Sequence, residues 1–415
     1  MKVLHMSTYD SRGAGRAAYR LHQGLQSIGI TSQLLVQSKS SDDQTVIGPH
    51  TKLEKGIAKF RPSLSGLPLS FYPQRELTDY YPSWLPDTVS HQVKQINPDI
   101  INLHWICAGY LEVQTIAKFN KPIVWTLHDM WAFTGGCHYS QNCDRYTNAC
   151  GACPQLRSQK DKDLSRWQWY RKAQALKGIN LTVVSPSAWL AKCAQMSSIF
   201  QDMRVEVIPN GLNPSRYKPV NRQLAREFLN LPQTKQLILF GAEKATLDKR
   251  KGFHLLQSAL RDLSQLSSWR DRVELVVFGS SQSDQQIDLG FPSHYLGKLS
   301  DDISLSLVYA AADVFIAPSL EDNLPNTVME AIACGTPCVA FKIGGMPDMI
   351  EHQKNGYLAQ PYKIEDLIQG ILWILEDEQR YQELSDSARQ KVEREFTFEI
   401  QARRYLSLFN SILKR

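Results

Sequence analysis

Short strand-like runs alternate with helix-like segments along the whole chain, and this alternation restricts the possible folds more than any other feature. In the first half the strand-like runs, rich in β-branched residues, lie at residues 2–6, 31–37, 100–103, 123–127 and 181–185. Helical patterns separate them, as at residues 16–27 and 187–196. Because parallel strands need a crossover that is usually helical, the alternation predicts an α/β fold with parallel sheets.

A turn near the middle of the chain divides this pattern in two. A strand-like run from residue 205 ends in Pro209, Asn210 and Gly211, which is turn chemistry. The alternation then restarts, with strand-like runs at residues 237–240, 273–278, 314–317 and 338–341 and helical patterns from residues 252, 326 and 364. We therefore expect two similar α/β halves that bind ligands at the carboxyl ends of their strands.

Composition limits the possible partners. Of the 415 residues, 43% are hydrophobic, enough for a core in each half, and the net charge of +6 permits a phosphate-rich ligand or an anionic membrane but is too small to indicate nucleic-acid binding. Apolar runs stay far below the ~20 residues of a membrane span, and residues 1–6 do not resemble a secretory signal. Together with the scattered Cys107, Cys193, Cys334 and Cys338, this predicts a cytoplasmic protein.

The loop after the first strand-like run contains Arg12, Gly13, Gly15 and Arg16 and leads into a helix. Glycines there let backbone N–H groups approach an anion at the helix N-terminus, and the arginines add positive charge. A generic turn is the alternative. The third glycine of a dinucleotide-binding fingerprint is missing, so we do not expect a dehydrogenase.

Two histidines end neighbouring strand-like runs of the first half. His104 follows residues 100–103, and His128 follows the next run and precedes Asp129. A lone histidine is more often structural than catalytic. Two imidazoles at the ligand-binding ends of strands favour a functional role, because imidazole exchanges protons near neutral pH.

A basic segment lies at strand ends of the second half. Gly241 ends one strand-like run, and Lys249, Arg250 and Lys251 precede the next helix. Three cations beside a helix N-terminus suit a diphosphate. A solvated basic turn is the commoner alternative for such a run.

An acidic segment follows residues 314–317. Glu321 and Asp322 precede a helix in which Glu330 lies among apolar residues. Burying a carboxylate is costly unless it is paired or holds hydroxyl groups. The hydroxyls of a ribose or a hexose are suitable partners, since a carboxylate accepts more than one hydrogen bond.

These segments together resemble the retaining GT-B glycosyltransferases of family 4, over essentially the whole chain. Residues 125–139 (WTLHDMWAFTGGCHY) and 318–337 are similar to the colanic-acid and exopolysaccharide subgroup. The resemblance implies an acceptor-side Rossmann-like domain at residues 1–208 with a Cys-rich insertion at 137–153, a nucleotide-sugar domain at 209–395 facing it across a cleft, and a helix at 396–415 that crosses back. It also implies no catalytic metal.

The resemblance assigns roles to individual residues. It implies that His128, Lys251, Arg250 and either Glu321 or Asp322 act on the donor, because the Glu-x7-Glu spacing from Glu330 falls on Asp322 with Glu321 one residue earlier. The implied donor-binding residues are Gly13, Gly15, Gly241, Lys249, Asn323, Leu324, Pro325, Asn326, Thr327 and Glu330. The implied acceptor-side residues are Arg12, Arg16, His104 and Asp129. The family's Gly-Arg step is altered, since Ala242 follows Gly241.

The expected reaction moves a hexosyl group from a UDP- or GDP-sugar to a hydroxyl of a glycan or lipid-linked acceptor in surface or exopolysaccharide synthesis. Retention without an obvious nucleophile implies same-face attack, with the leaving phosphate taking the proton. A non-catalytic nucleotide-sugar-binding module and a GT-B epimerase or phosphorylase are the alternatives.

Four cysteines lie close together in the insertion, namely Cys137, Cys143, Cys150 and Cys153. Four thiolates with a terminal Cys-x-x-Cys suit a structural zinc ion, and free thiols or two disulfides are the alternatives.

Two stretches, residues 157–177 and 52–84, mix basic and aromatic side chains and suggest peripheral contact with an anionic membrane. Solvated helices with inward aromatics are an equal alternative.

Overall fold

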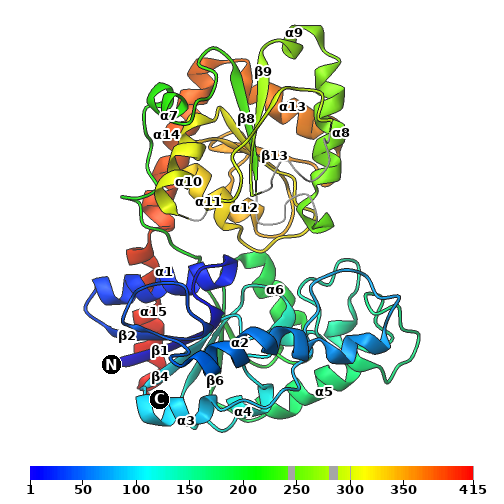
Figure 1. The fold of residues 1–415 in the computed structure, drawn as a ribbon, viewed down its shortest axis with the longest axis vertical. Helices are drawn as coiled ribbons and strands as arrows, with labels where there is room; N and C mark the ends of the chain where they lie inside the picture. The colour runs from blue at the N-terminus through cyan, green and yellow to red at the C-terminus, as the bar shows by residue number, and fades with distance from the viewer. Residues whose placement is uncertain (242–247, 280–287, 300, 415) are drawn as a thin grey trace. The chain divides into compact units, whose positions relative to one another are not determined.

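The chain forms two compact α/β units. The computed structural model describes residues 1–241, 248–279, 288–299 and 301–414. Unit 1 comprises Met1–Gly211 and Phe398–Arg415, and unit 2 comprises Leu212–Thr397. Each unit contains a parallel sheet with helices packed against it (Figure 1). The predicted fold class, α/β with two Rossmann-like sheets, is therefore confirmed.

The sheet of unit 1 has the strand order β3-β2-β1-β4-β5-β6-β7. Its strands are β1 (Lys2–Tyr9), β2 (Thr31–Ser38), β3 (Val46–Ile47), β4 (Ile100–Leu103), β5 (Ile123–Thr126), β6 (Leu181–Ser185) and β7 (Arg204–Val207). Strand β1 lies between β2 and β4, so the chain winds outward in both directions, as in doubly wound folds. The carboxyl ends of β1, β4 and β5 therefore meet at one edge.

Helices cover both faces of this sheet. They are α1 (Gly13–Ser27), α2 (Lys52–Ser65), α3 (Val89–Ile96), α4 (Val113–Ile116), α5 (Leu164–Leu176), α6 (Ala188–Met196) and α15 (Phe398–Leu413), with 3-10 turns η1 (Leu67–Phe71), η2 (Trp131–Phe133) and η3 (Arg145–Thr147). Side-chain caps begin several of them; the Ser187 hydroxyl, for example, accepts the N–H of Leu190 at 3.1 Å.

Alternate residues of the strands enter different cores, as the two-residue period of a strand requires. Val3 packs with Leu21 of α1 and Tyr405 of α15, whereas Leu4 packs on the opposite side with Trp125. The Tyr405 hydroxyl also lies 2.8 Å from the Thr126 hydroxyl. The C-terminal helix is thus part of the core of unit 1.

The sheet of unit 2 has the order β10-β9-β8-β11-β12-β13. Its strands are β8 (Gln236–Gly241), β9 (Val273–Phe278), β10 (Ser293–Tyr295), β11 (Val314–Ala317), β12 (Cys338–Phe341) and β13 (Gly356–Ala359). Its helices are α7 (Arg222–Phe228), η4 (Lys249–Lys251), α8 (Phe253–Ser264), α9 (Ser267–Arg270), α10 (Asp302–Ala311), α11 (Asn326–Ala333), α12 (Met346–Met349), α13 (Ile364–Leu375) and α14 (Glu378–Glu395). Since β8 and β11 are neighbours, the loops that follow them share an edge.

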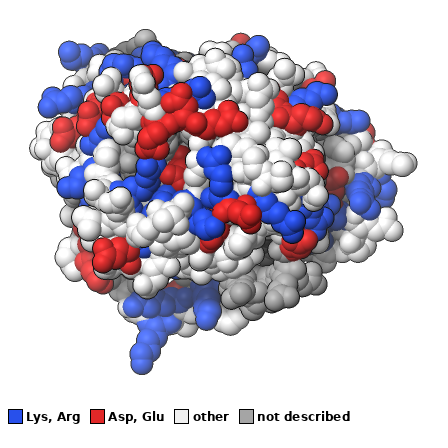
Figure 2. All heavy atoms as spheres, turned by 90° about the horizontal axis from the view of Figure 1, so that it is seen from above, with Lys and Arg blue, Asp and Glu red and all other residues white. Residues whose placement is uncertain are grey.

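Helix hydropathy and surface charge bear on contact with membranes and nucleic acids. Among the described helices, none has the length and apolar character needed to cross a membrane. On the face drawn in Figure 2, lysines and arginines are interspersed with aspartates and glutamates over the described residues. The net charge of +6 is therefore not gathered into one patch on that face.

Candidate functional site

The basic turn and the acidic loop of unit 2 are joined at the carboxyl edge of its sheet. The backbone N–H of Leu320 donates to the carbonyl of Arg250 at 2.7 Å. Gly252 has φ +71°, and a Cβ there would lie 1.8 Å from the carbonyl oxygen of Pro318. Glycine is required because a side chain would prevent both the backbone conformation and this close approach.

Asp322 pairs with Lys251 and Arg250, two of the three cations of the basic turn. Its Oδ2 lies 2.7 Å from Lys251 Nζ and 3.3 Å from Arg250 Nη1. Burial raises the pKa of this carboxyl, but the charges of Lys251 and Arg250 outweigh burial and lower the pKa to about 2. Asp322 is therefore ionised at neutral pH and holds the two cations at the edge of the sheet.

Glu321 and Asp322 occupy different environments although they are adjacent. The Asp322 side chain is buried, and its oxygens also accept from Ser319 Oγ at 3.3 Å and from the N–H of Asn323 at 3.1 Å. Glu321 is half-buried, and its backbone carbonyl accepts from Arg250 Nη1 at 2.8 Å. Asp322 thus positions the cations, while the Glu321 carboxylate is the more accessible of the two acids.

Glu330 lies on α11 and is 2% exposed. The Tyr309 hydroxyl donates to Glu330 Oε2 at 3.1 Å. Burial and then the charge of Glu330 raise the pKa of Tyr309 well above its usual range, so the hydroxyl keeps its proton and remains a donor. Tyr309 was not predicted from the sequence, because it lies on α10, 21 residues before Glu330.

The remaining predicted donor-site residues surround this core. Asn323, Leu324 and Pro325 are buried, Asn326 and Thr327 are half-buried at the start of α11, and Lys249 is exposed. Gly241 ends β8, and a Cβ there would lie 2.4 Å from the ring of Phe278, which gives this glycine a packing role. Ala242, where the sequence departs from the family pattern, lies outside the described residues.

In unit 1, three histidines form a hydrogen-bonded chain across neighbouring strands. His128 Nε2 lies 3.0 Å from His104 Nδ1, and His104 Nε2 lies 3.0 Å from Nδ1 of His5 on β1. Burial lowers the pKa of His128 to about 4 and places those of His104 and His5 well below the usual range. The three rings are therefore neutral at physiological pH, and each nitrogen in the chain is either a donor or an acceptor.

The direction of this chain follows from Asn102. Thr126 Oγ1 donates to Asn102 Oδ1 at 2.9 Å, which leaves Asn102 Nδ2 as the group 3.3 Å from His5 Nδ1. Because Nδ2 is a donor, His5 Nδ1 accepts, so His104 donates to His5 and His128 donates from Nε2 to His104. The network thus assigns His128 a tautomer with an acceptor Nδ1.

Two of the predicted acceptor-side residues, Arg12 and Asp129, are linked at this edge through Tyr9 and Trp105. The Arg12 guanidinium lies 5.1 Å from the centre of the Tyr9 ring, and Tyr9 stacks on Trp105 with centroids 5.9 Å apart. Trp105 Nε1 donates to Asp129 Oδ2 at 3.1 Å. Trp105, which directly follows His104, was missed by sequence reasoning because one tryptophan among nine carries no motif.

Asp129 and the glycine loop also have structural roles. Asp129 Oδ2 lies 2.5 Å from His138 Nδ1, and Asp129 Oδ1 accepts the N–H of Trp131 at 2.8 Å. Gly15 packs against β1, since a Cβ there would lie 2.2 Å from the carbonyl oxygen of Tyr9. Gly13 has φ +21°, and a Cβ there would meet no atom within 4 Å; Arg16 lies one turn into α1.

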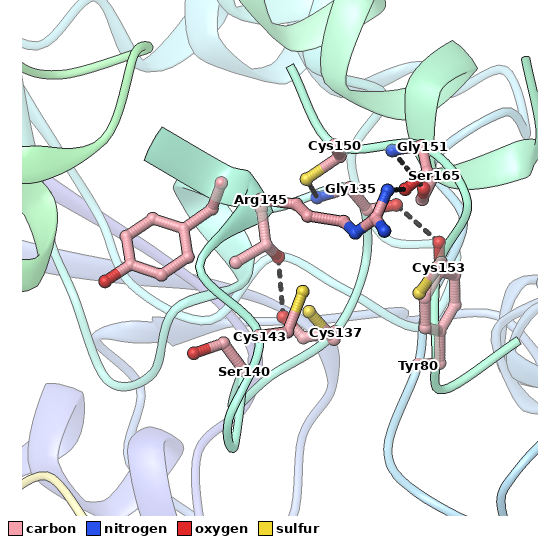
Figure 3. Close-up of a pocket in the computed structure, with 12 residues that line it drawn as sticks. Tyr80, Gly135, Cys137, Ser140, Cys143, Arg145, Cys150, Gly151, Cys153 and Ser165 are labelled. Carbon is pink, nitrogen blue, oxygen red and sulfur yellow. Dashed lines mark hydrogen bonds between the residues drawn. The ribbon is translucent and has the colours of Figure 1, made fainter. Parts of the chain in front are cut away.

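The four cysteines of the insertion line one pocket, together with Tyr80 (Figure 3). All four are free thiols, so the two-disulfide alternative is not found. Burial raises the pKa of Cys150 to about 12 and that of Cys153 to about 11, which favours the protonated thiols. Among the described residues, no group of three or more histidine, cysteine or acidic side chains has metal-holding geometry, so the predicted zinc site is not supported.

Both units match models of known protein families. Residues 11–216 match the model of the Glycosyltransferase Family 4, and residues 221–391 match that of the Glycosyl transferases group 1. The D-inositol 3-phosphate glycosyltransferase of Arthrobacter sp. FB24 is 23% identical over 385 residues, which cover 88% of this chain and 83% of that protein.

Other relatives match over shorter stretches. The sulfoquinovosyl transferase SQD2 of Arabidopsis thaliana is 31% identical over 148 residues, 35% of this chain and 28% of that protein. The putative colanic acid biosynthesis glycosyl transferase WcaC of Escherichia coli K12 is 24% identical over 284 residues, 62% of this chain and 63% of that protein. This chain therefore spans less than two thirds of the length of these two relatives.

A solved structure shows the same fold over the whole chain. Anabaena Alr3699/HepE, in complex with UDP, has a TM-score of 0.66 at 18% identity, with 99% of this chain and 100% of that chain covered. The two matched family models point to the same family as the fold does. The acidic and basic loops at the strand ends are consistent with it. The chain belongs to the family 4, group 1 glycosyltransferases, enzymes of class EC 2.4, and has their GT-B fold.

Proposed function

We propose that this protein transfers a hexosyl group, with retention of configuration, from a UDP- or GDP-sugar to a hydroxyl of a glycan or lipid-linked acceptor. The observation that carries the donor assignment is the cluster of Lys251, Arg250 and Asp322 at the carboxyl edge of the unit 2 sheet. The structure of HepE with UDP supports a nucleotide donor by similarity. Similarity to WcaC supports a role in surface or exopolysaccharide synthesis.

The diphosphate, the ribose and the hexose of the donor each have a proposed partner in unit 2. Lys251 and Arg250 bind the diphosphate, because fixed cations stabilise negative charge without reorganising during the reaction. Glu330 accepts the ribose hydroxyls, and Tyr309 holds its carboxylate in place. Glu321 is the better candidate for the hexose hydroxyls, since Asp322 is already engaged by the cations.

The bond between the anomeric carbon and the diphosphate oxygen breaks, and a bond from the acceptor oxygen to the anomeric carbon forms on the same face. The leaving diphosphate takes the acceptor proton, and Lys251 and Arg250 stabilise its growing charge. His128 orients the donor sugar, and the chain through His104 and His5 fixes the orientation of its ring. Arg12 and Asp129 belong to the acceptor side. The proposed site of action is the cytoplasm, at the inner face of the plasma membrane.

Nucleotide release from a panel of UDP-, GDP- and ADP-sugars tests this function. The wild type should release one nucleotide, and Glu330→Ala should lose most of that activity together with donor affinity. Lys354→Ala is a matched control, because Lys354 is 65% exposed and pairs with Glu351 at the surface. Donor binding without turnover in the presence of any tested acceptor would instead support a binding module.

A further inference from the structure

Helix α2 and the 3-10 turn η1 present a continuous row of exposed apolar side chains. We call this row the α2 stripe; it consists of Leu53, Ile57, Phe60, Leu64, Leu67 and Phe71. Leu53 is 74% exposed, Phe60 68% and Phe71 84%. The members follow one another at intervals of three or four residues, which places those of the helix on one face. Such a contiguous apolar row is unusual on a protein surface and marks an interaction site.

Helix α2, which carries the stripe, is attached to the rest of unit 1 by hydrogen bonds. The capping box of Thr51 and Glu54 begins α2. Arg61 Nε donates to the carbonyl of Gly109 at 2.5 Å, and Trp84 Nε1 donates to that of Ser65 at 3.0 Å. The helix is therefore held by its polar groups, with its apolar face directed outward.

Lysines accompany the stripe along one flank. Lys52, Lys55 and Lys59 are exposed and also follow at intervals of three and four, so they form a second row beside the apolar one. Glu54, the one acidic residue of α2, accepts the N–H groups of His50 and Thr51 at the cap. An apolar face flanked by lysines matches the boundary between acyl chains and anionic headgroups.

The other basic and aromatic stretch, residues 157–177, has a different arrangement. On α5, Lys172 is fully buried and donates to the carbonyls of Trp131 and Thr134. Arg171 pairs with Glu112. These two cations are used inside unit 1, and the exposed Arg157, Lys160 and Lys162 lie before α5 and form no row along that helix. The structure thus distinguishes two stretches that look equivalent in the sequence.

We propose that the α2 stripe, with Lys52, Lys55 and Lys59, is the surface through which this protein binds an anionic lipid bilayer. The helix lies in the interface with its apolar row among the acyl chains and its lysines at the phosphates. A lipid surface is the favoured partner because it offers acyl chains to the apolar row and phosphates to the lysine row at the same time. The inference does not depend on the donor chemistry proposed above.

Sedimentation of the full-length protein with vesicles tests the proposal. The vesicles contain phosphatidylcholine alone or with phosphatidylglycerol, each at low and high salt. The wild type should bind the anionic vesicles at low salt and bind them less at high salt, because salt screens the lysines. The triple variant Leu53→Ser, Ile57→Ser, Phe60→Ser should bind at least about tenfold more weakly, since each buried apolar side chain contributes.

Two further variants keep the result interpretable. The triple variant Lys52→Gln, Lys55→Gln, Lys59→Gln should lose the preference for anionic vesicles. The double variant Leu224→Ser, Phe228→Ser is the control, because these α7 side chains in unit 2 are 62% and 75% exposed but lie outside the stripe. It should bind vesicles like the wild type. Circular dichroism and thermal unfolding serve to check that each variant is folded.

Three results would overturn the proposal. The first is a wild type that does not bind anionic vesicles at low salt. The second is a folded stripe variant that binds as well as the wild type. The third is self-association of the wild type through the stripe, seen by light scattering as a dimer that the stripe variant converts to a monomer. Because donor turnover is measured separately with a soluble acceptor, loss of membrane binding is distinguishable from loss of the proposed function.

Discussion

Replacing Asp322 with asparagine removes the charge that holds Lys251 and Arg250 together. The pKa of this carboxyl is about 2 in the fold, against an unperturbed value of 3.8. The difference is roughly two units, and at 1.36 kcal/mol per unit it corresponds to a contribution of about 2 kcal/mol to stability. We expect Asp322→Asn to lower the free energy of unfolding at pH 7 by about that amount.

The effect has a defined pH dependence. Because the pKa of Asp322 is lower in the folded than in the unfolded protein, its contribution is complete above about pH 4 and is lost as the pH falls towards 2. Urea unfolding of wild type and Asp322→Asn should therefore differ most at neutral pH. The two curves should approach each other in acid.

Asp248→Asn is the matched comparison for this experiment. Asp248 pairs with the same arginine at 3.2 Å, but its side chain is 31% exposed. Removing its surface ion pair and its cap on η4 should cost at most about 1 kcal/mol. The reasoning is refuted if Asp322→Asn unfolds like the wild type at pH 7, or if a difference persists unchanged to pH 2.

Three other substitutions test separate parts of the account. Gly252→Ala should lower the free energy of unfolding by at least about 2 kcal/mol, because of the positive φ and the close contact with the Pro318 carbonyl. A thermal unfolding curve like that of the wild type would contradict this. His104→Phe interrupts the histidine chain and should reduce kcat more than KM in initial-rate assays, with unchanged circular dichroism; an unaltered kcat would remove His104 from the positioning role. Tyr309→Phe should weaken donor binding by about 1 kcal/mol in calorimetry, since Glu330 loses one donor, and wild-type affinity would show that the hydroxyl has no such role.

The parallel sheets could be predicted from the sequence because their strands are buried on both faces and read as apolar runs. Strand β4 and strand β9 begin and end at the predicted residues. The strands β3 and β10 were not predicted, since two or three residues carry too little pattern, and β13 was not predicted because its sequence, GYLA, contains no β-branched residue. Their place in a sheet is decided by neighbouring strands.

The candidate site was predictable as residue types but not as contacts. Asp322 and Lys251 are 71 residues apart, and only the pairing of β8 with β11 brings their loops together. His5 was not predicted as a site residue because it lies within a strand, and its contact with His104 depends on the register of β1 against β4. The zinc prediction was made from cysteine spacing, which does not determine where the sulfur atoms point.

In the proposed function, Lys251 and Arg250 bind the diphosphate of a nucleotide donor. Calorimetric titration with a nucleoside diphosphate and the matching monophosphate measures this directly, once the base has been identified among UDP, GDP and ADP. The wild type should bind the diphosphate at least about tenfold more tightly, and Lys251→Ala should remove most of that difference while Lys354→Ala keeps it. Equal affinity for the two nucleotides in the wild type, or an undiminished difference in Lys251→Ala, would contradict the account.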